Sequence, residues 1–290
     1  AQLWIDNGTV SKNSGTALVV YGKTRITGGT LNALIAGGIT FRENGIISIE
    51  GGILNASQIK TAAEGSGTNG GYVQTGGAVN VTGGTTDTDY YVFTLPYSSS
   101  VFNMSGGTLK VNTSTANGGI LIGSAPENYK VTGGSVIAET QSTQDFRITS
   151  TAPFWNFELR NSSAAARQFI LSEAQNIGPA NINIAAQPLK VLNDLRIWGK
   201  ESGGDSYPSI AFITGINDVY IGGSFFIESG SQYIPVSGGT PPYDAIANQP
   251  SLRNTTYFVR TAGTSPVEEL YHGDPVNQLE FGTLSIDRTN

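Results

Sequence analysis

The stretch Ile26-Thr27-Gly28-Gly29-Thr30-Leu31 decides the fold, because its pattern of apolar residue, spacer, glycine pair, small residue or Ile, and apolar residue recurs along the chain. The other copies are Ile49-Glu50-Gly51-Gly52-Ile53-Leu54, Met104-Ser105-Gly106-Gly107-Thr108-Leu109, Val131-Thr132-Gly133-Gly134-Ser135-Val136, Tyr220-Ile221-Gly222-Gly223-Ser224-Phe225 and a looser Gly76-Gly77-Ala78-Val79. In the N-terminal half the pairs begin at positions 28, 51, 76, 106 and 133, in steps of 23, 25, 30 and 27 residues. A period of roughly 20–50 residues is typical of repeat arrays. The pattern therefore predicts a chain of stacked rungs.

Short segments between the glycine pairs alternate between apolar and polar residues, which predicts strands of three to six residues. They are rich in β-branched residues and are bounded by Gly, Asn and Ser; examples are residues 46–49, 91–95, 119–122, 181–184 and 219–221. Helical spacing is confined to residues 164–175, where the apolar run 169–171 is too continuous to separate helix from strand. We therefore expect an all-β chain.

The glycine pairs supply a residue that takes positive φ without a Cβ clash, so the chain can turn sharply between two sides of a rung. On the strand that follows, alternate residues point the same way, as in Leu31 with Ala33, Leu109 with Val111 and Phe225 with Ile227. Stacked at about 4.8 Å per rung, such positions build a dry apolar interior. The sequence predicts a parallel β-helix, or β-solenoid, and we expect a right-handed coil because parallel crossovers have that hand.

We interpret residues 1–290 as one β-solenoid segment of about ten rungs with lateral loops. The glycine pairs thin out from about residue 140, which predicts a change of cross-section near 140–150. Residues 235–278 hold six prolines and are expected to leave the stack as loops. Both ends of the chain read as ordinary rung material without a cap, so we expect further rungs on both sides in a longer protein. The isolated piece would then self-associate or fray at its ends.

Composition excludes several classes of protein. A formal net charge of −6 and a pI near 4.8 argue against a nucleic-acid partner, which requires clustered Lys and Arg. The sequence has no apolar run long enough for a membrane-spanning helix. With no cysteine it has neither disulfides nor a thiolate nucleophile, and long bacterial surface solenoids can do without disulfides because each rung is held by its neighbours. We therefore expect a bacterial, extracellular protein.

Acidic pairs are the first candidates for catalysis, since β-helix enzymes that cleave polysaccharides need clustered acids beside Lys, Arg or His. The close pairs are Asp87 with Asp89 and Glu268 with Glu269, and neither has such neighbours in the sequence. Asp87 and Asp89 follow a glycine pair, so they read as a solvated turn, with a Ca²⁺ site as the alternative. The single histidine, His272, lies in a proline-flanked segment and reads as incidental. We predict no enzyme, and no catalytic, cofactor or metal site.

Clustered aromatic residues are a softer signal of binding. One group comprises Tyr90, Tyr91, Phe93 and Tyr97, and another comprises Tyr207, Tyr233, Tyr243 and Tyr257. Exposed tyrosines on a rigid β surface can stack on sugar rings, whereas alternate aromatics in strands more often fill the core or stack between rungs. Both interpretations stay open at the level of sequence.

A resemblance to known proteins is carried by the turns of the type 131–136 and by the segments 154–161, 189–197 and 284–290. With these in rungs, the chain resembles the long β-solenoid surface proteins of Bacteroidetes that the type IX secretion system exports, among them the giant adhesins of gliding motility. The resemblance covers most of the chain and is one of style, so it transfers no functional residues. It implies a secreted or cell-surface adhesin segment.

Three functions follow as hypotheses. The first is a rigid stalk or filament segment of a large surface adhesin, with extracellular surfaces or glycans and the adjoining rungs as partners. The second is a polysaccharide-active β-helix enzyme or its accessory module. The third is a separate glycan-binding or receptor-binding module. An acidic cleft on one β face would favour the enzyme, and a featureless polar surface would favour the stalk.

Overall fold

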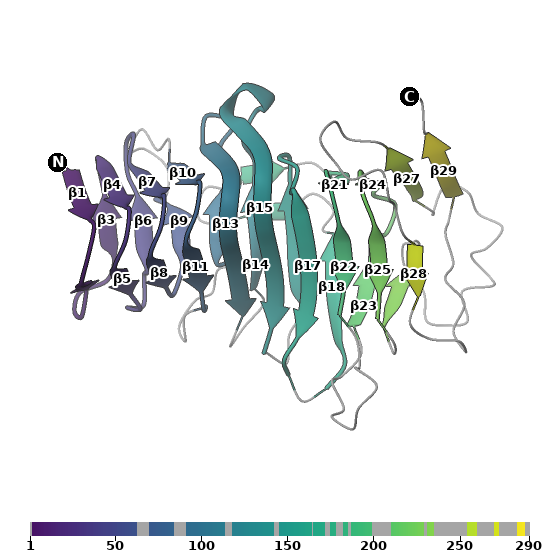
Figure 1. Ribbon diagram of the computed structural model, residues 1–290, viewed down its shortest axis with the longest axis horizontal. Helices are drawn as coiled ribbons and strands as arrows, with labels where there is room; N and C mark the ends of the chain where they lie inside the picture. Colours follow the sequence, from purple (N-terminus) through teal and green to yellow (C-terminus); the bar gives the residue numbers. More distant parts are fainter. Residues whose placement is uncertain are drawn as a thin grey trace.

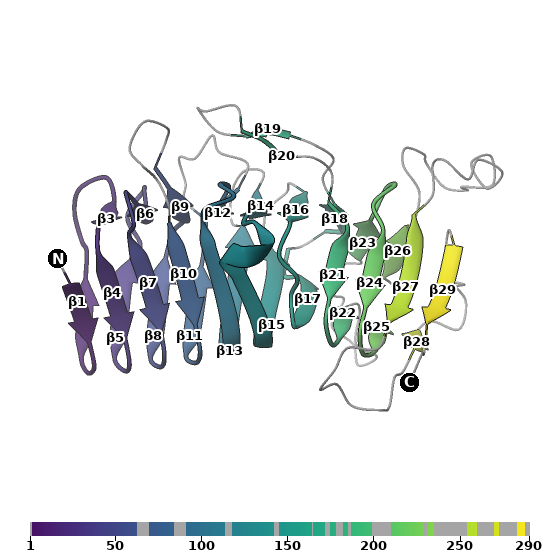
Figure 2. The same ribbon diagram turned by 90° about the horizontal axis from the view of Figure 1, so that it is seen from above.

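The protein is an elongated stack of strands that follow one another along its long axis from β1 toward β29 (Figure 1). This computed structural model describes residues 2–62, 70–83, 91–113, 118–141, 145–163, 165–171, 175–177, 182–184, 187–198, 210–228, 231–234, 254–259, 270–272 and 283–287. Seen from above, the strands of successive repeats lie side by side in long rows (Figure 2). The molecule is therefore built by repetition along one direction.

The first sheet has 14 strands. Its main path runs in the order β1 (Gln2–Ile5), β4 (Lys23–Ile26), β7 (Ile46–Ile49), β10 (Gly71–Gln74), β13 (Val101–Thr113), β15 (Tyr129–Thr140), β17 (Asn156–Asn161), β22 (Leu195–Ile197), β25 (Phe225–Ile227) and β28 (Leu270–His272). A side row joins it through β13 and consists of β2 (Thr9–Ser11), β5 (Thr30–Ala33), β8 (Ile53–Ala56) and β11 (Ala78–Val81).

The second sheet has nine strands and follows the same chain order: β3 (Leu18–Val20), β6 (Ile39–Phe41), β9 (Ile59–Thr61), β12 (Phe93–Leu95), β14 (Gly118–Ile122), β16 (Phe146–Ser150), β18 (Arg167–Leu171), β23 (Ile210–Ile213) and β26 (Gln232–Ile234). The third sheet has four strands: β21 (Leu189–Val191), β24 (Val219–Ile221), β27 (Thr255–Val259) and β29 (Thr283–Asp287). A small hairpin-like pair is formed by β19 (Gln175–Ile177) and β20 (Ile182–Ile184).

The prediction of an all-β chain with parallel strands is confirmed. Strand pairs within the three large sheets are parallel, and among the described residues the antiparallel pairing is that of β19 with β20. The helical content of the described part is one 3₁₀ turn, η1 (Pro126–Asn128). The segment 164–175, left open between helix and strand, contains β18, whose Phe169 and Leu171 face the core.

The glycine pairs are required by the stacking itself, as Gly51 and Gly52 illustrate. A Cβ on Gly51 would lie 2.3 Å from the Thr27 carbonyl oxygen of the preceding repeat. Gly52 has φ +67°, and its Cβ would lie 2.5 Å from the Gly29 carbonyl oxygen. The first glycine of the pair thus permits close approach of two backbones, and the second adds the left-handed conformation. The expected positive φ is found, and it falls on the second glycine.

The core is a set of buried columns in which equivalent residues of successive repeats are register partners. One column has side chains at most 1 % exposed and comprises Leu31, Leu54, Val79, Leu109, Val136, Phe157, Leu195 and Phe225. Ala33, Val111 and Ile227, predicted to point inward, are also fully buried. These columns form an apolar interior that continues from β5 to β25.

Two details differ from the sequence expectation. β13 and β15, at 13 and 12 residues, continue through their glycine pairs and exceed the expected length of three to six. Gly222 and Gly223 do not share the positive φ of the earlier pairs. By the register of β21 with β24 and of β22 with β25, the equivalent residues of the preceding repeat are Leu192 and Asn193, and the carboxylate of the next residue, Asp194, accepts a hydrogen bond from the Ser224 amide at 2.9 Å.

The pairing of the strands differs between the two halves of the stack. Up to β11 the side row accompanies the main path of the first sheet, and later an isolated bridge of Phe154 with Val191 precedes the third sheet. Within the predicted excursion at 235–278, the structure describes 254–259 and 270–272, and strands β27 and β28 pair there with β24 and β25.

Candidate binding groove on the first sheet

The four acidic candidates lie outside the part of the chain that the structure describes. Asp87, Asp89, Glu268 and Glu269 belong to this group, as do the aromatic candidates Tyr90, Tyr207 and Tyr243. His272 is the last residue of β28, where its backbone pairs with Ile227 of β25. Among the described residues no group of three or more His, Cys, Asp or Glu side chains is arranged to hold a metal ion. No helix of the described part is long and apolar enough to span a bilayer.

Three of the aromatic candidates belong to the core. Tyr91 and Phe93 are at most 1 % exposed, and the Phe93 ring packs edge-on against Tyr72 at 5.2 Å. Tyr233 packs edge-on against Phe225 at 5.3 Å, and its hydroxyl accepts a hydrogen bond from the Asn254 side chain at 3.0 Å. Burial raises the pKa of Tyr233 to about 12, against the opposing effect of these hydrogen bonds. Their positions bear out the core interpretation for these residues.

Tyr97 and Tyr257 are partly exposed. Tyr257 stacks on Tyr220 of the neighbouring strand, with ring centroids 4.5 Å apart and an interplanar angle of 5°. Burial is the main cause of a raised pKa at Tyr220, and the neighbouring Tyr257 and Asp218 raise this pKa further. The pair is a rung-to-rung stack in which each ring covers one face of the other, which is the second of the roles expected for strand aromatics.

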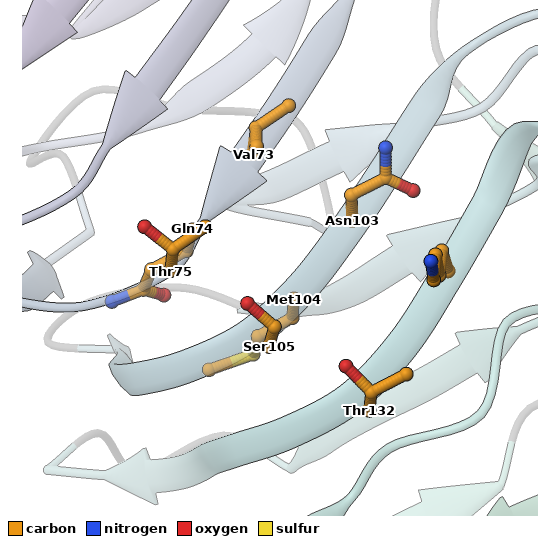
Figure 3. Close-up of a pocket in the computed structure, with 8 residues that line it drawn as sticks. Val73, Gln74, Thr75, Asn103, Met104, Ser105 and Thr132 are labelled. Carbon is orange, nitrogen blue, oxygen red and sulfur yellow. The ribbon is translucent and has the colours of Figure 1, made fainter.

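A groove that the sequence did not predict lies on the outer face of the first sheet, across β10, β13 and β15. Its volume is about 190 Å³. Figure 3 shows its lining on three neighbouring strands, with Val73, Gln74 and Thr75 on or next to β10, Asn103, Met104 and Ser105 on β13, and Thr132 on β15. Lys130 of β15 is the eighth lining residue.

A register irregularity coincides with the groove. Met104 pairs with Val131 and Ser105 with Gly133, so Thr132 is an extra residue on β15 at this point. The opposite shift between Ser105 and Thr108 restores the original register. Extra residues of this kind bend a strand locally and re-aim its side chains. The groove therefore arises where β15 departs from β13.

The groove combines a buried floor with a polar rim. Gln74 and Met104 are at most 1 % exposed and belong to the interior. Thr75, Ser105, Lys130 and Thr132 are exposed, and Val73 and Asn103 are half-buried. The rim therefore offers hydroxyl groups, one amide and one ammonium group to solvent. The lining contains neither a carboxylate nor a histidine, so it supplies no acid–base pair and no activated nucleophile.

Four other cations along this sheet are neutralised by neighbouring carboxylates, whereas Lys23 of β4 is exposed and forms no such pair with the described residues. The ion pairs are Arg25–Glu50 at 2.7 Å, Lys110–Glu139 at 2.7 Å, Arg160–Glu158 at 2.6 Å and Arg196–Glu228 at 2.5 Å. The Arg196 guanidinium also lies 3.8 Å from the centre of the Trp198 ring, and Trp198 Nε1 donates to Glu158 Oε2 at 2.8 Å. The charges of Arg160 and Arg196 are thus balanced by Glu158 and Glu228, and the Arg196 guanidinium covers the Trp198 ring.

No family model, curated protein or solved structure matches this chain.

A weak sequence signal for the groove does exist in the spacer of the glycine motif. Glu50, Thr75, Ser105 and Thr132 are all polar residues placed directly before a glycine pair. Stacked repeats bring such positions together on the outer face of the sheet, where they form a row. Only the local register of β13 and β15 turns part of that row into a groove, and the sequence pattern gives no sign of that register.

Proposed function

We propose that the chain is a rigid stalk or filament segment of a large secreted cell-surface adhesin, built as a parallel β-helix, and that it is structural and adhesive rather than catalytic. The observation that carries this proposal is the column from Leu31 to Phe225, in which consecutive register partners are all buried. A continuous interior of this kind couples each rung to the next, so the stack resists bending and local opening. Rigidity along the chain is what a spacer requires.

The surface chemistry supports the same role. Charged residues are 13 % of the chain, against about 25 % in typical domains, and the four ion pairs of the first sheet are self-compensated. Thr, Ser and Asn supply much of the exposed polarity, as in the side chains linked from Asn32 to Asn55 and from Asn55 to Asn80, each at 2.9 Å. Such ladders tie neighbouring rungs together on the outside.

Force spectroscopy on the intact chain tests the spacer role and the adhesive role together. The chain is tethered by its two ends, and we expect it to unfold in discrete steps at high force. A chain that extends smoothly at low force, like a flexible linker, would contradict the spacer role. A tip coated with the chain should adhere to glycan-coated or protein-coated surfaces, and a tip that adheres no better than an uncoated one would contradict the adhesive role.

A glycan-binding module is the second candidate, and the groove across β10, β13 and β15 is the observation that favours it. The groove has no carboxylate, so it favours binding over cleavage. Pectins and alginates incubated with the protein should therefore release no new reducing or unsaturated ends. Cleavage that disappears in Asp87→Ala or Asp89→Ala would instead establish an enzyme whose site lies in residues 84–90.

A further inference from the structure

We propose that the groove lined by Val73, Asn103, Ser105, Lys130 and Thr132 binds an acidic saccharide, with the Lys130 ammonium group paired to a carboxylate or sulfate of the sugar. The proposal rests on the second candidate function, glycan binding, and names its site and ligand class. The stalk function does not depend on it, because a spacer needs no ligand.

The charge of the groove is the first argument. Lys130 is exposed, and within the described residues no carboxylate lies within ion-pair distance of it, whereas Arg25, Lys110, Arg160 and Arg196 each have one. The lining adds no acid of its own. The groove therefore presents one uncompensated positive charge and is complementary to a single anionic group, and Lys23 of β4, which is also exposed and unpaired, does not line it.

The rim is the second argument. Thr75 directly follows β10, and Ser105 and Thr132 lie on β13 and β15, so three neighbouring strands bring a hydroxyl group each to the rim. Hydroxyl and amide groups both donate and accept hydrogen bonds, which suits the hydroxyl groups of a sugar ring. The exposed part of Val73 adds an apolar contact beside Asn103. A saccharide satisfies all three kinds of group at once.

The floor is the third argument, because a binding surface needs fixed geometry. Gln74 is fully buried, and its Nε2 donates to the carbonyl oxygens of Gly76 at 3.2 Å, Gly77 at 3.3 Å and Thr108 at 3.1 Å. Its Oε1 accepts a hydrogen bond from the Tyr72 hydroxyl at 2.7 Å. The strands on either side of the floor are thus tied together beneath the groove.

Other ligand classes fit less well. β10 and β13 are paired on both sides where they line the groove, so a peptide strand could add only beside residues 129–134 of β15, because β17 pairs with β15 from Ser135 onward. One lysine on a chain of net charge −6 is too little for a nucleic acid. The volume of about 190 Å³ is below the roughly 300–1,000 Å³ of pockets that enclose drug-sized ligands, so we expect one sugar unit to occupy it.

Titration of the intact chain with oligogalacturonate, followed by NMR or calorimetry, tests the proposal. We expect weak binding, with a Kd near the millimolar range, that decreases with salt. Lys130→Met should weaken it about three- to fivefold, in line with an exposed charge pair. Lys190→Met, which removes an exposed lysine on the third sheet, is the matched control and should bind like the unmodified protein. Both variants should keep the circular dichroism spectrum and melting temperature.

Two further titrations compare carboxylate with sulfate as the bound anion and measure what the sugar itself contributes to binding. A sulfated galactose oligomer in place of oligogalacturonate shows whether sulfate or carboxylate is preferred, and binding of either one supports the site. Uncharged galactose oligomers should bind more weakly than both, and acetate or sulfate ions alone should not compete at equal concentration.

Three outcomes would overturn the proposal. They are no binding of either acidic oligomer at about 10 mM, equal binding by Lys130→Met, and full competition by the simple ions. Because none of these outcomes bears on the force measurements, they leave the stalk function intact. Equal binding by Lys130→Met together with retained glycan adhesion would move the glycan site elsewhere on the chain without removing glycan binding.

Discussion

The buried Tyr72 hydroxyl donates a hydrogen bond to Gln74 Oε1 at 2.7 Å, and this pair places a polar link inside an otherwise apolar column. The equivalents of Gln74 are Ile26 and Ile49 in preceding repeats and Met104 in the next. Gln74 compensates for its burial by donating to the backbone of two successive glycine turns. A polar side chain at this depth is tolerated because its hydrogen bonds are made within the core.

Tyr72→Phe should lower the free energy of unfolding by about 1–3 kcal/mol, because it leaves Gln74 Oε1 buried without its donor. Gln74→Leu should be costly as well, since it removes the donor to the Gly76 carbonyl oxygen. The double variant removes both polar groups, and we expect it to lose less than the sum of the two single losses. Urea denaturation of the four proteins measures this coupling, and strict additivity would show that the two side chains do not act as a unit.

Three glycines separate the two reasons for the glycine pairs. Gly8 has φ +72° and no atom within 4 Å of the point where a Cβ would lie, Gly51 is crowded by Thr27 without positive φ, and Gly52 has both constraints. Gly8→Ala should therefore cost about 1–2 kcal/mol from the left-handed conformation alone. Gly52→Ala should cost a further 1–3 kcal/mol, roughly, from the clash with the Gly29 carbonyl oxygen.

Thermal and urea denaturation of these variants gives the comparison, with Gly51→Ala reporting the clash by itself. If Gly52→Ala cost no more than Gly8→Ala, the approach of neighbouring backbones would not be a constraint, and the pairs would serve the turn alone.

Sequence reasoning reached the strands and the stacking, because both follow from a local pattern repeated many times. Apolar residues at alternate positions decide which side chains are buried, and Leu31, Leu109 and Phe225 are all found in the core. The glycine pair at 51–52 is equally local, since each residue meets the backbone of the preceding copy of the same motif.

The groove could not be reached in this way, because it depends on how two strands align. Ser105 pairs with Gly133 instead of Thr132, and this shift by one residue is seen only in the pairing of β13 with β15. The sequence could not separate core aromatics from surface aromatics for a similar reason. Tyr233 and Tyr257 have similar sequence surroundings, yet Tyr233 is in the core and Tyr257 is partly exposed. Only the three-dimensional register distinguishes them.

The stability of the protein should fall at high pH because of Tyr233. Burial raises its pKa to about 12 in the folded protein, while the unfolded chain ionises near the ordinary value of 10. Between these values the unfolded chain loses a proton that the folded protein keeps, so the free energy of unfolding falls as pH rises from about 10 to 12. The full contribution, present below pH 10, is roughly 2–3 kcal/mol.

Denaturation midpoints measured from pH 8 to pH 12 test this expectation, with Tyr233→Phe as the comparison. In the variant the denaturation midpoint should decline less steeply over the upper part of the pH range. Absorbance at about 295 nm reports tyrosine ionisation, and the number of tyrosines that ionise only when the protein unfolds should be smaller by one in the variant. Tyr72, whose pKa burial also raises well above 10, contributes in the same direction and remains in the variant. An unchanged slope would place the Tyr233 hydroxyl in contact with solvent.

Glu139 and Glu50 both form ion pairs with cations of the first sheet, and their different burial predicts different consequences of mutation. The Glu139 side chain is 8 % exposed and accepts hydrogen bonds from Lys110 at 2.7 Å, Asn112 at 3.1 Å and Ser162 at 2.9 Å. The Glu50 side chain is 33 % exposed and pairs with an Arg25 side chain that is 39 % exposed. Glu139→Ala should therefore lower the free energy of unfolding by about 1–3 kcal/mol, because Asn112 loses its partner inside the protein.

Glu50→Ala should change stability only slightly, and 1 M salt should remove that difference, because salt screens exposed charges. The loss in Glu139→Ala should largely persist in salt, since much of it comes from a buried amide left without a hydrogen bond. Urea denaturation of both variants at low and high salt makes the comparison. Equal and salt-sensitive losses would mean that Glu139 acts only through its charge, and the link that it forms between β13, β15 and Ser162 would then not stabilise the stack.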